Sequence, residues 1–234
     1  GDKSVIGGLS VAVPGEVAGF EYLLDNYGSD AVSRQQIFQP AIDTANNGYV
    51  VGVTFKEELD SEYTGIAANE TLSNIYLDES GLPYEVGDVI KNPDLAKTLQ
   101  LIADGGKDAF YTGDMAQAMV DAVAAWGGNM TMEDLANYEV KVREPVVGHY
   151  KDYTIYSLPP ASSGGTHLVE ILNILENYDD MDKIGVNSAE YVHRFSEAFK
   201  IAFADRAQYM ADTDFADVPL AQLTSKDYAA ERYS

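Results

Sequence analysis

The sequence predicts an α/β protein that is rich in helix, with a few strands around 138-158. An alternating run from Tyr153 to Leu158 has the two-residue period of a strand, and we expect it to be buried on at least one face. The pair Pro159-Pro160 ends this run, because proline supplies no N–H group to a strand ladder. Most of the remaining chain repeats its apolar residues at the three- and four-residue spacing of helices.

Five helices are predicted before residue 138. They are expected over 16–26, over 37–46, from Pro93 to the Gly105-Gly106 pair, over 114–126, and briefly after Thr131. Asn92 precedes the third helix as an N-cap, and Thr131 with Asp134 matches the capping-box pattern. The segment 65–88 has few periodic apolar positions, so we expect it to be a surface excursion inside the domain.

The second part of the chain is predicted to hold two strands and then helices. Strands are expected over 138–147 and 150–158, joined through Gly148-His149. The residues Ser162-Ser163-Gly164-Gly165 then allow a tight turn into a helix that carries Leu168, Ile171, Leu172 and Leu175. The longest helix is expected over 188–210, and a shorter one near Ser225. The buried side of the helix over 188–210 is expected to carry Tyr191, Phe195, Phe199 and Ala202.

Several motifs, in order, resemble the large subunit of γ-glutamyltransferase (glutathione hydrolase). The most specific is Leu158-Pro-Pro-Ala-Ser-Ser-Gly-Gly-Thr-His-Leu, followed by Ile171-Leu-Asn-Ile-Leu-Glu. Others are Val13-Pro-Gly-Glu-Val-Ala-Gly, Asn92-Pro-Asp-Leu-Ala, Asp108-Ala-Phe-Tyr-Thr-Gly, Met132-Glu-Asp-Leu-Ala, Ala202-Phe-Ala-Asp-Arg and residues 212–219. The likeness runs almost end to end and is weakest over 65–88.

This resemblance implies a fold and an activity. The fold is part of the αββα sandwich of N-terminal nucleophile hydrolases, with 1–234 as a single domain fragment of the large subunit. The activity is transfer of a γ-glutamyl group from glutathione or a similar donor to water, an amino acid or a dipeptide. A poly-γ-glutamate capsule depolymerase or a cephalosporin acylase of the same family is the runner-up. A catalytically silent binding module is the alternative from another class.

The resemblance carries no catalytic residue onto any position of this chain. The family's Arg that grips the substrate carboxylate lies before the point that matches Gly1, and its Thr nucleophile and small subunit lie beyond Ser234. We therefore expect the small subunit of the same precursor as a partner, and leave substrate-binding residues unassigned. We also expect the isolated chain to be inactive. Family members carry an export signal, which implies a periplasmic or secreted bacterial protein.

Charge and composition exclude several other functions. Fifteen Lys and Arg face 38 Asp and Glu, a formal charge of −23, which would repel phosphate backbones and excludes nucleic acid as a partner. The absence of cysteine excludes disulfides and thiolate metal sites. No apolar run is long enough to span a membrane. The chain begins with Gly1-Asp2 and has no signal segment, so we expect it to be part of a longer protein.

Two residue groups near the glycine-rich turn invite a catalytic interpretation. The Ser162–Gly165 turn could hold an anion at a helix N-terminus, but it lacks the spacing of a phosphate loop and is expected to be architectural. Thr166-His167 resembles the context of the family's nucleophilic Thr. Because the family places this run well before its cleavage point, we expect Thr166 to be a helix-start residue.

The remaining polar candidates predict no metal and no cofactor. His149, His167 and His193 are too scattered for a local zinc motif. Asp212, Asp214 and Asp217 lack the EF-hand pattern, so turn roles are favoured over calcium. Asp205 and Arg206 are adjacent on a helix and must find separate partners. The sequons at Asn69 and Asn129 are given little weight.

Overall fold

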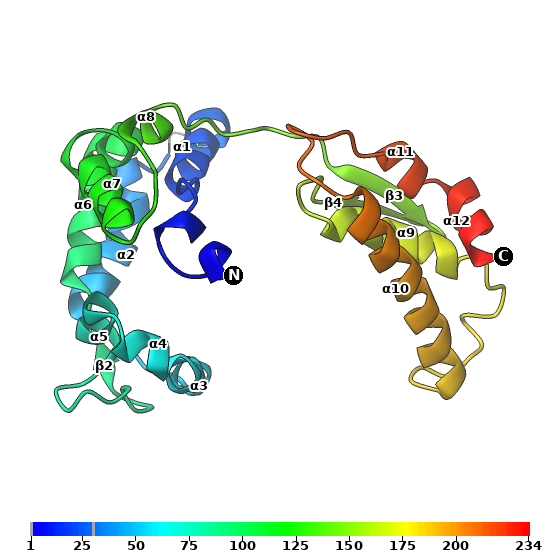
Figure 1. Cartoon of the computed structure of the whole chain (residues 1–234), viewed down its shortest axis with the longest axis horizontal. Coiled ribbons are helices and arrows are strands. Elements are labelled where there is room, and N and C mark those ends of the chain that lie inside the picture. The colour runs from blue at the N-terminus through cyan, green and yellow to red at the C-terminus, as the bar shows by residue number, and fades with distance from the viewer. Residues whose placement is uncertain (1, 30) are drawn as a thin grey trace. The chain divides into compact units, whose positions relative to one another are not determined.

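The computed structural model describes residues 2–29 and 31–234, and these residues form two compact units (Figure 1). Unit 1 extends to Val140, and unit 2 is Lys141–Ser234. Each unit is described by itself. That residues 1–234 form a single domain stays a prediction.

Unit 1 is almost entirely helical, with one small antiparallel sheet. Two 3-10 turns, Asp2–Ser4 and Gly8–Ser10, precede the first α-helix. The elements are α1 (Glu16–Tyr27), α2 (Arg34–Asn47), β1 (Tyr49–Val50), α3 (Val53–Ser61), α4 (Tyr63–Ala67), α5 (Glu70–Tyr76), β2 (Val89–Ile90), α6 (Pro93–Tyr111), α7 (Gly113–Ala125) and α8 (Met132–Ala136). β1 pairs with β2, with Tyr49 opposite Ile90.

The predicted helix signals of unit 1 are confirmed where a capping residue fixes them. Asn92 accepts a hydrogen bond from the Leu95 amide at 2.9 Å, and Thr131 forms the expected capping box with Asp134. α2 begins at Arg34, earlier than expected, because Ser33 and Gln36 form a second capping box ahead of the apolar residues. The expected end of α6 at the glycine pair corresponds to a break at Gly106, after which a further helical stretch runs to Tyr111.

The segment 65–88 is more ordered than the sequence predicts. Its first half contains most of α4 and all of α5, and only the part from Leu77 onward is loop. An apolar cluster unites this region with its neighbours and consists of Val51, Leu59, Ile66, Leu77 and Ile90. Residues 65–76 lie largely at the surface, as predicted, and Ile66 is buried there. Their helices were not predicted, because widely spaced apolar residues converge here without forming a periodic pattern.

Unit 1 is tied together by small residues and by one buried ion pair. α2 packs on α6 through Ile42, Ala45, Ala96 and Ala103. Glu21 on α1 is buried, and its carboxylate accepts two hydrogen bonds from Arg34 on α2, at 2.7 and 2.6 Å. Such a bidentate pair orients both helices and leaves neither charge alone.

Unit 2 is a hairpin covered on one face by helices. Its elements are β3 (Val146–Tyr150), β4 (Tyr153–Ser157), α9 (Gly164–Leu175), α10 (Ala189–Tyr209), α11 (Leu220–Leu223) and α12 (Lys226–Tyr233). α10 and α12 match the helices expected over 188–210 and near Ser225. The core joins α9, α10 and α12 through Ile171, Ile174, Leu175, Ala198, Ala202 and Ala229.

The predicted strand pair needs correction. Residues 138–145 form no strand, and β3 instead begins at Val146, directly after a proline that offers no N–H. The turn lies at Lys151-Asp152, so Gly148-His149 is inside β3 and does not connect two strands. Gly148 is needed there because Val169 of α9 lies directly over it, and an added Cβ would come within 2.4 Å of that side chain.

The expected buried faces are also wrong in part. Tyr153 and Tyr156 of β4 are 73% and 70% exposed, and only Ile155 and Ser157 are half-buried. On α10, Ala198 and Ala202 are buried as the core requires, whereas Phe199 is 45% exposed. Unit 2 thus keeps large apolar surfaces open, which ordinary monomeric domains avoid.

Candidate functional site

The glycine-rich turn joins β4 to α9, as predicted. Gly165, in the first turn of α9, lies against the end of β4, where an added Cβ would stand 2.3 Å from the Leu158 carbonyl oxygen. Arg206 of α10 donates a hydrogen bond from Nε to Ser163 Oγ at 3.0 Å. The turn is therefore a packed connection whose nearby cation already binds a serine hydroxyl, which favours the architectural role over anion binding.

Thr166 lies inside the first turn of α9 and is fully buried, with 0% of its surface exposed. Its Oγ1 has no hydrogen-bond partner among the described residues. A nucleophile needs both a base within reach and access for a substrate. Thr166 has neither in this fold.

Directly after it, a cluster of buried polar side chains joins α9 to α10 and α12. His167 Nδ1 lies 3.0 Å from Glu170 Oε2, and both residues are buried. Asp205 of α10 is also buried and accepts a hydrogen bond from the Tyr228 hydroxyl of α12 at 2.8 Å. Arg232 Nη2 lies 3.6 Å from the other Asp205 oxygen. The prediction that Asp205 and Arg206 take separate partners is thus confirmed.

Burial makes the His167–Glu170 contact a neutral one near pH 7. Burial raises the pKa of Glu170 to about 8, and the adjacent Asp205 carboxylate adds to the rise. Burial also lowers the pKa of His167, with the Arg206 charge as a further cause. Burial and Asp205 together raise the pKa of Tyr228 to about 12, so this phenol remains a hydrogen-bond donor.

Sequence analysis missed Glu170, Tyr228 and Arg232, although a signal for Glu170 was present. Thr166, Glu170 and Asn173 follow one another at helical spacing inside an otherwise apolar stretch, so three polar side chains share one face of α9. All three are buried, and each keeps one oxygen atom without a hydrogen-bond partner among the described residues. A polar stripe inside an apolar helix predicts a buried network.

The other histidines lie apart from this cluster. His149 is exposed on β3, with Nδ1 3.3 Å from Thr154 Oγ1. His193 is exposed on α10, and its Nδ1 lies 4.0 Å from Glu197. Within the described residues, no group of three or more His, Cys, Asp or Glu has the arrangement of a metal site.

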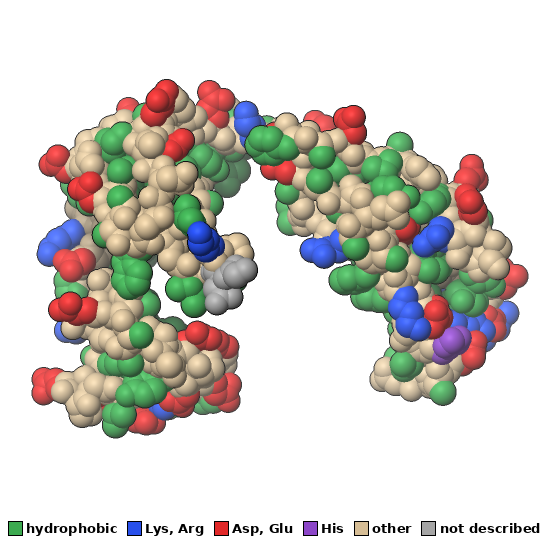
Figure 2. Space-filling view, in the orientation of Figure 1, with side chains coloured by type: hydrophobic (Ala, Val, Ile, Leu, Met, Phe, Trp, Pro, Cys, Tyr) green, Lys and Arg blue, Asp and Glu red, His purple; other side chains and the backbone are tan. Residues whose placement is uncertain are grey.

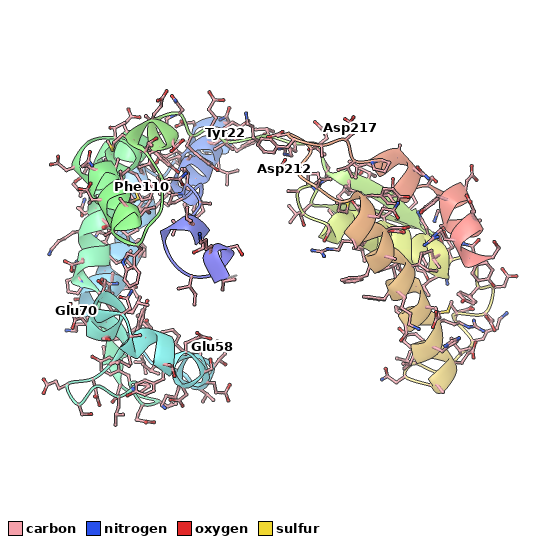
Figure 3. The ribbon with its side chains drawn as sticks, viewed as in Figure 1. Tyr22, Glu58, Glu70, Phe110, Asp212 and Asp217 are labelled. Atoms are coloured by element: carbon pink, nitrogen blue, oxygen red, sulfur yellow. The ribbon has the colours of Figure 1, made fainter. Side chains whose placement is uncertain are left out.

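The aspartates after α10 hold the start of unit 2. Asp212 and Asp217 lie in the loop between α10 and α11 (Figure 3). Arg143 Nη2 is 2.8 Å from Asp214 and 3.7 Å from Asp212, and Asp212 also accepts a hydrogen bond from the Asp214 amide. These contacts support the predicted turn role. Of the two sequons, Asn69 caps α5 and Asn129 precedes α8.

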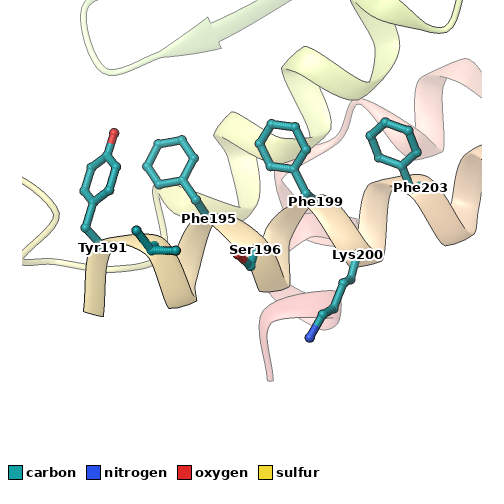
Figure 4. Close-up of a pocket in the computed structure, with 7 residues that line it drawn as sticks. Tyr191, Phe195, Ser196, Phe199, Lys200 and Phe203 are labelled. Atoms are coloured by element: carbon teal, nitrogen blue, oxygen red, sulfur yellow. The ribbon is translucent and has the colours of Figure 1, made fainter. Parts of the chain in front are cut away.

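A stripe of aromatic side chains on α10 forms an extended apolar surface of unit 2. The rings of Tyr191, Phe195, Phe199 and Phe203 project from one side of the helix, and Lys200 projects from the opposite side (Figure 4). The four-residue spacing explains the alignment. The stripe lines a shallow groove that is mostly apolar, with Ser196 and Lys200 as its polar side chains, and such a surface suits docking of another protein segment.

The face of the β3–β4 hairpin that the helices do not cover is a second exposed apolar surface of unit 2. β3 and β4 expose Val147 and Tyr156, paired side by side, and Leu158 follows with 68% exposure.

Acidic side chains are spread over the face shown in Figure 2, in keeping with the excess of Asp and Glu. Among the residues that the structure describes, no helix is both long and apolar enough to cross a bilayer.

This chain is similar to known proteins over nearly its whole length. The family model described as gamma-glutamyltranspeptidase matches residues 1–234. The glutathione hydrolase proenzyme of Escherichia coli (strain K12) is 40% identical over 97% of this chain, and the acylase ACY 1 proenzyme of Pseudomonas sp. (strain SE83) is 40% identical over 98%. This chain spans only 39% and 40% of their respective lengths.

A solved structure agrees with the fold. The crystal structure of Helicobacter pylori gamma-glutamyltranspeptidase matches with a TM-score of 0.94 and 39% identity. The match covers 99% of this chain and 66% of that one. The predicted fold class, a helix-rich part of the αββα N-terminal nucleophile hydrolase sandwich, is thereby confirmed.

Proposed function

This chain belongs to the gamma-glutamyltranspeptidase family, and from that membership we propose that it is the large-subunit scaffold of an enzyme acting on γ-glutamyl compounds. The enzyme would transfer or hydrolyse the γ-glutamyl group of glutathione and related compounds. The observation that carries the proposal is the 40% identity to a glutathione hydrolase proenzyme, spread over 97% of this chain. A likeness that extends over nearly the whole chain is more specific than any one motif.

In the proposed mechanism, the nucleophile is an N-terminal Thr that lies outside residues 1–234. Its hydroxyl would attack the γ-glutamyl carbonyl, and its own α-amine would take the hydroxyl proton and pass it to the amine that leaves as the donor's amide bond breaks. Water or an acceptor amine would then take the γ-glutamyl group and free the threonine. Burial of Thr166 supports this division, because the threonine of the Thr166-His167 pair is closed to any substrate. No residue of this chain is assigned a catalytic or metal-binding role, and no cofactor is required.

The partner that we propose is the small subunit of the same precursor. The aromatic stripe on α10 and the open face of the β3–β4 hairpin are apolar and exposed, as surfaces are when another part of a fold normally covers them. A second sheet placed on the hairpin would complete the layered sandwich of the family. For the assembled enzyme we propose a small-molecule γ-glutamyl substrate and, because the relatives are bacterial, a periplasmic or secreted location.

A cephalosporin-type acylase is the second candidate. It is favoured by one observation, the 40% identity to the acylase ACY 1 proenzyme, which equals the identity to the glutathione hydrolase proenzyme. The same scaffold would serve both reactions, because the residues that contact an acyl donor are expected outside this chain.

A direct assay separates the candidates. A protein that contains this chain and the remaining segments of the family is incubated with a chromogenic γ-glutamyl anilide and, separately, with an N-acylated cephalosporin. We expect turnover of the anilide by the longer protein and none by the 234-residue chain alone. Preference for the cephalosporin would favour the acylase, and anilide turnover by the short chain would refute the scaffold role.

A further inference from the structure

The interior of unit 2 brings two carboxyl groups together from different helices. Glu170 of α9 is 0% exposed and Asp205 of α10 is 4% exposed, and the second carboxylate is close enough to raise the pKa of the first. Tyr228 and Arg232, both on α12, contact Asp205 at 2.8 and 3.6 Å. The polar cluster therefore joins α9 and α10 to the last helix of the chain.

The charges that face Glu170 can be named element by element. On its own helix it contacts His167, which is neutral near pH 7 because burial lowers its pKa. From α10 it faces Asp205, and from α12 it faces the charge of Arg232 and the phenol of Tyr228. After α11, the Thr224 carbonyl accepts a hydrogen bond from Asn173 at 2.8 Å and adds no charge. The partly exposed guanidinium of Arg232 is thus the cation that faces both buried carboxyl groups, Glu170 and Asp205.

α12 depends on these contacts for its position. Within the described residues α12 spans Lys226–Tyr233, and its side-chain contacts with the rest of unit 2 fix where it lies. Ala229 is buried on the inner side of α12. The ring of Tyr233 packs edge-on against Tyr178, and Lys226 forms an ion pair with Glu176. Lys226 also donates a hydrogen bond to the His149 carbonyl oxygen of β3 at 2.7 Å, and Tyr228 and Arg232 both contact Asp205.

We propose that α12 is a pH-dependent latch, closed while Glu170 holds a proton beside Asp205 and released when that proton passes to solvent. Two adjacent buried carboxylates repel one another and lack the hydration that ionised groups need. Release of α12 admits water to both carboxylates and relieves this cost. The device does not depend on the proposed enzymatic activity, because all of its parts lie in unit 2.

The direction and window of the effect follow from the two pKa shifts. The pKa of Glu170 is about 8 when buried against an ordinary value of 4.5, so deprotonation favours the open form increasingly between those values and no further above 8. The pKa of His167 is lowered from 6.5, so below pH 6.5 protonation of this ring favours the open form as pH falls. Above pH 6.5 the His167 effect fades, and the Glu170 effect sets the direction up to pH 8.

Hydrogen exchange of the α12 amides tests the latch in the full 234-residue chain. After correction for the intrinsic pH dependence of exchange, the opening equilibrium should rise roughly tenfold between pH 6.5 and 8, and less steeply as pH approaches the pKa of the buried Glu170. In the Glu170→Gln variant, which keeps the shape of the side chain and cannot ionise, the opening equilibrium should be flat over this range. An equally steep rise in Glu170→Gln, or no rise in the unsubstituted chain, would overturn the proposal.

Glu176→Gln is the matched control. It makes the same chemical change at the end of the same helix and weakens the pair with Lys226, but it leaves the acid pair intact. α12 should open more often at every pH in this variant, with the slope retained, and loss of the slope would contradict the proposal. The infrared spectrum needs no variant: a protonated carboxyl band should be present at pH 6.5 and disappear through pH 8. Its absence at pH 6.5 would also overturn the latch.

Discussion

Thr166 illustrates at the scale of one residue how environment decides chemistry. Its neighbour His167 and its sequence context resemble those of a nucleophilic threonine, yet it is fully buried in the first turn of α9. Its hydroxyl is a buried polar atom with no partner among the described residues, so it contributes a desolvation cost and no compensating hydrogen bond. The same surroundings that exclude a substrate also make the hydroxyl dispensable.

Replacing Thr166 by Val should therefore leave the fold intact. The two side chains have nearly the same shape, and we expect the free energy of unfolding to stay equal or to rise by about 1 kcal/mol, because an unpaired hydroxyl is removed. Urea unfolding measures this. Thr166→Ala, which also removes a methyl group, should lose about 1 kcal/mol as a control. A loss above 1 kcal/mol in Thr166→Val would show that the hydroxyl has a partner.

Intact mass provides a separate check on Thr166. The chain should remain unbroken on storage, because self-cleavage between Gly165 and Thr166 would detach β4 from α9 and needs a reactive hydroxyl. Fragments with that boundary would make Thr166 a candidate nucleophile.

At the scale of elements, the contact between β4 and the start of α9 organises unit 2. Gly165 allows the first turn of α9 to rest on the Leu158 carbonyl, which is backbone and cannot rotate away. Gly165→Ala should lower the free energy of unfolding by about 2 to 3 kcal/mol, because helix and strand must separate to admit a methyl group. Urea unfolding monitored by circular dichroism would measure the loss.

The neighbouring glycine is the matched control. An added Cβ at Gly164 would meet only Ser162 Oγ, at 3.5 Å, so Gly164→Ala should be neutral or stabilising by up to about 1 kcal/mol through helix propensity. Equal losses at positions 164 and 165 would contradict the close approach as the cause.

Elements marked by local signals could be predicted from the sequence, and those set by distant contacts could not. Asn92, Thr131 and Ser188 cap helices close to where the pattern places them, because a cap acts within one turn. The placement of β3 depends on Val169 resting over Gly148, and residues 65–76 depend on a cluster assembled from several elements. The buried Glu170 faces Asp205, which lies 35 residues later in the sequence, and no local pattern predicts contacts over that separation.

At the scale of the molecule, unit 2 leaves apolar surface open that the sequence analysis expected to be buried. The expectation was wrong for Phe199 within the described structure. Helical spacing identifies which residues share a face of α10 and does not tell whether the covering segment lies in the same 234 residues. The small residues Ala198 and Ala202 are buried in the core of unit 2 with Phe195 packed against them, whereas Phe199 and Phe203 are 45% and 55% exposed.

We predict that the aromatic stripe of α10 binds the rest of the family's fold. Phe199→Asp with Phe203→Asp places charges in the C-terminal half of the stripe and leaves the buried Ala198 and Ala202 unchanged. Phe215→Asp is the matched control, because Phe215 lies outside the stripe and is 88% exposed. Each variant is produced together with the segments that complete the family's length.

The central measurement is co-purification of this chain with those segments, read together with turnover of a γ-glutamyl anilide. The unsubstituted chain and Phe215→Asp should each give a stoichiometric, active complex, while Phe199→Asp with Phe203→Asp should lose both the complex and the turnover. A complex and turnover unaffected by charges in the stripe would contradict the account.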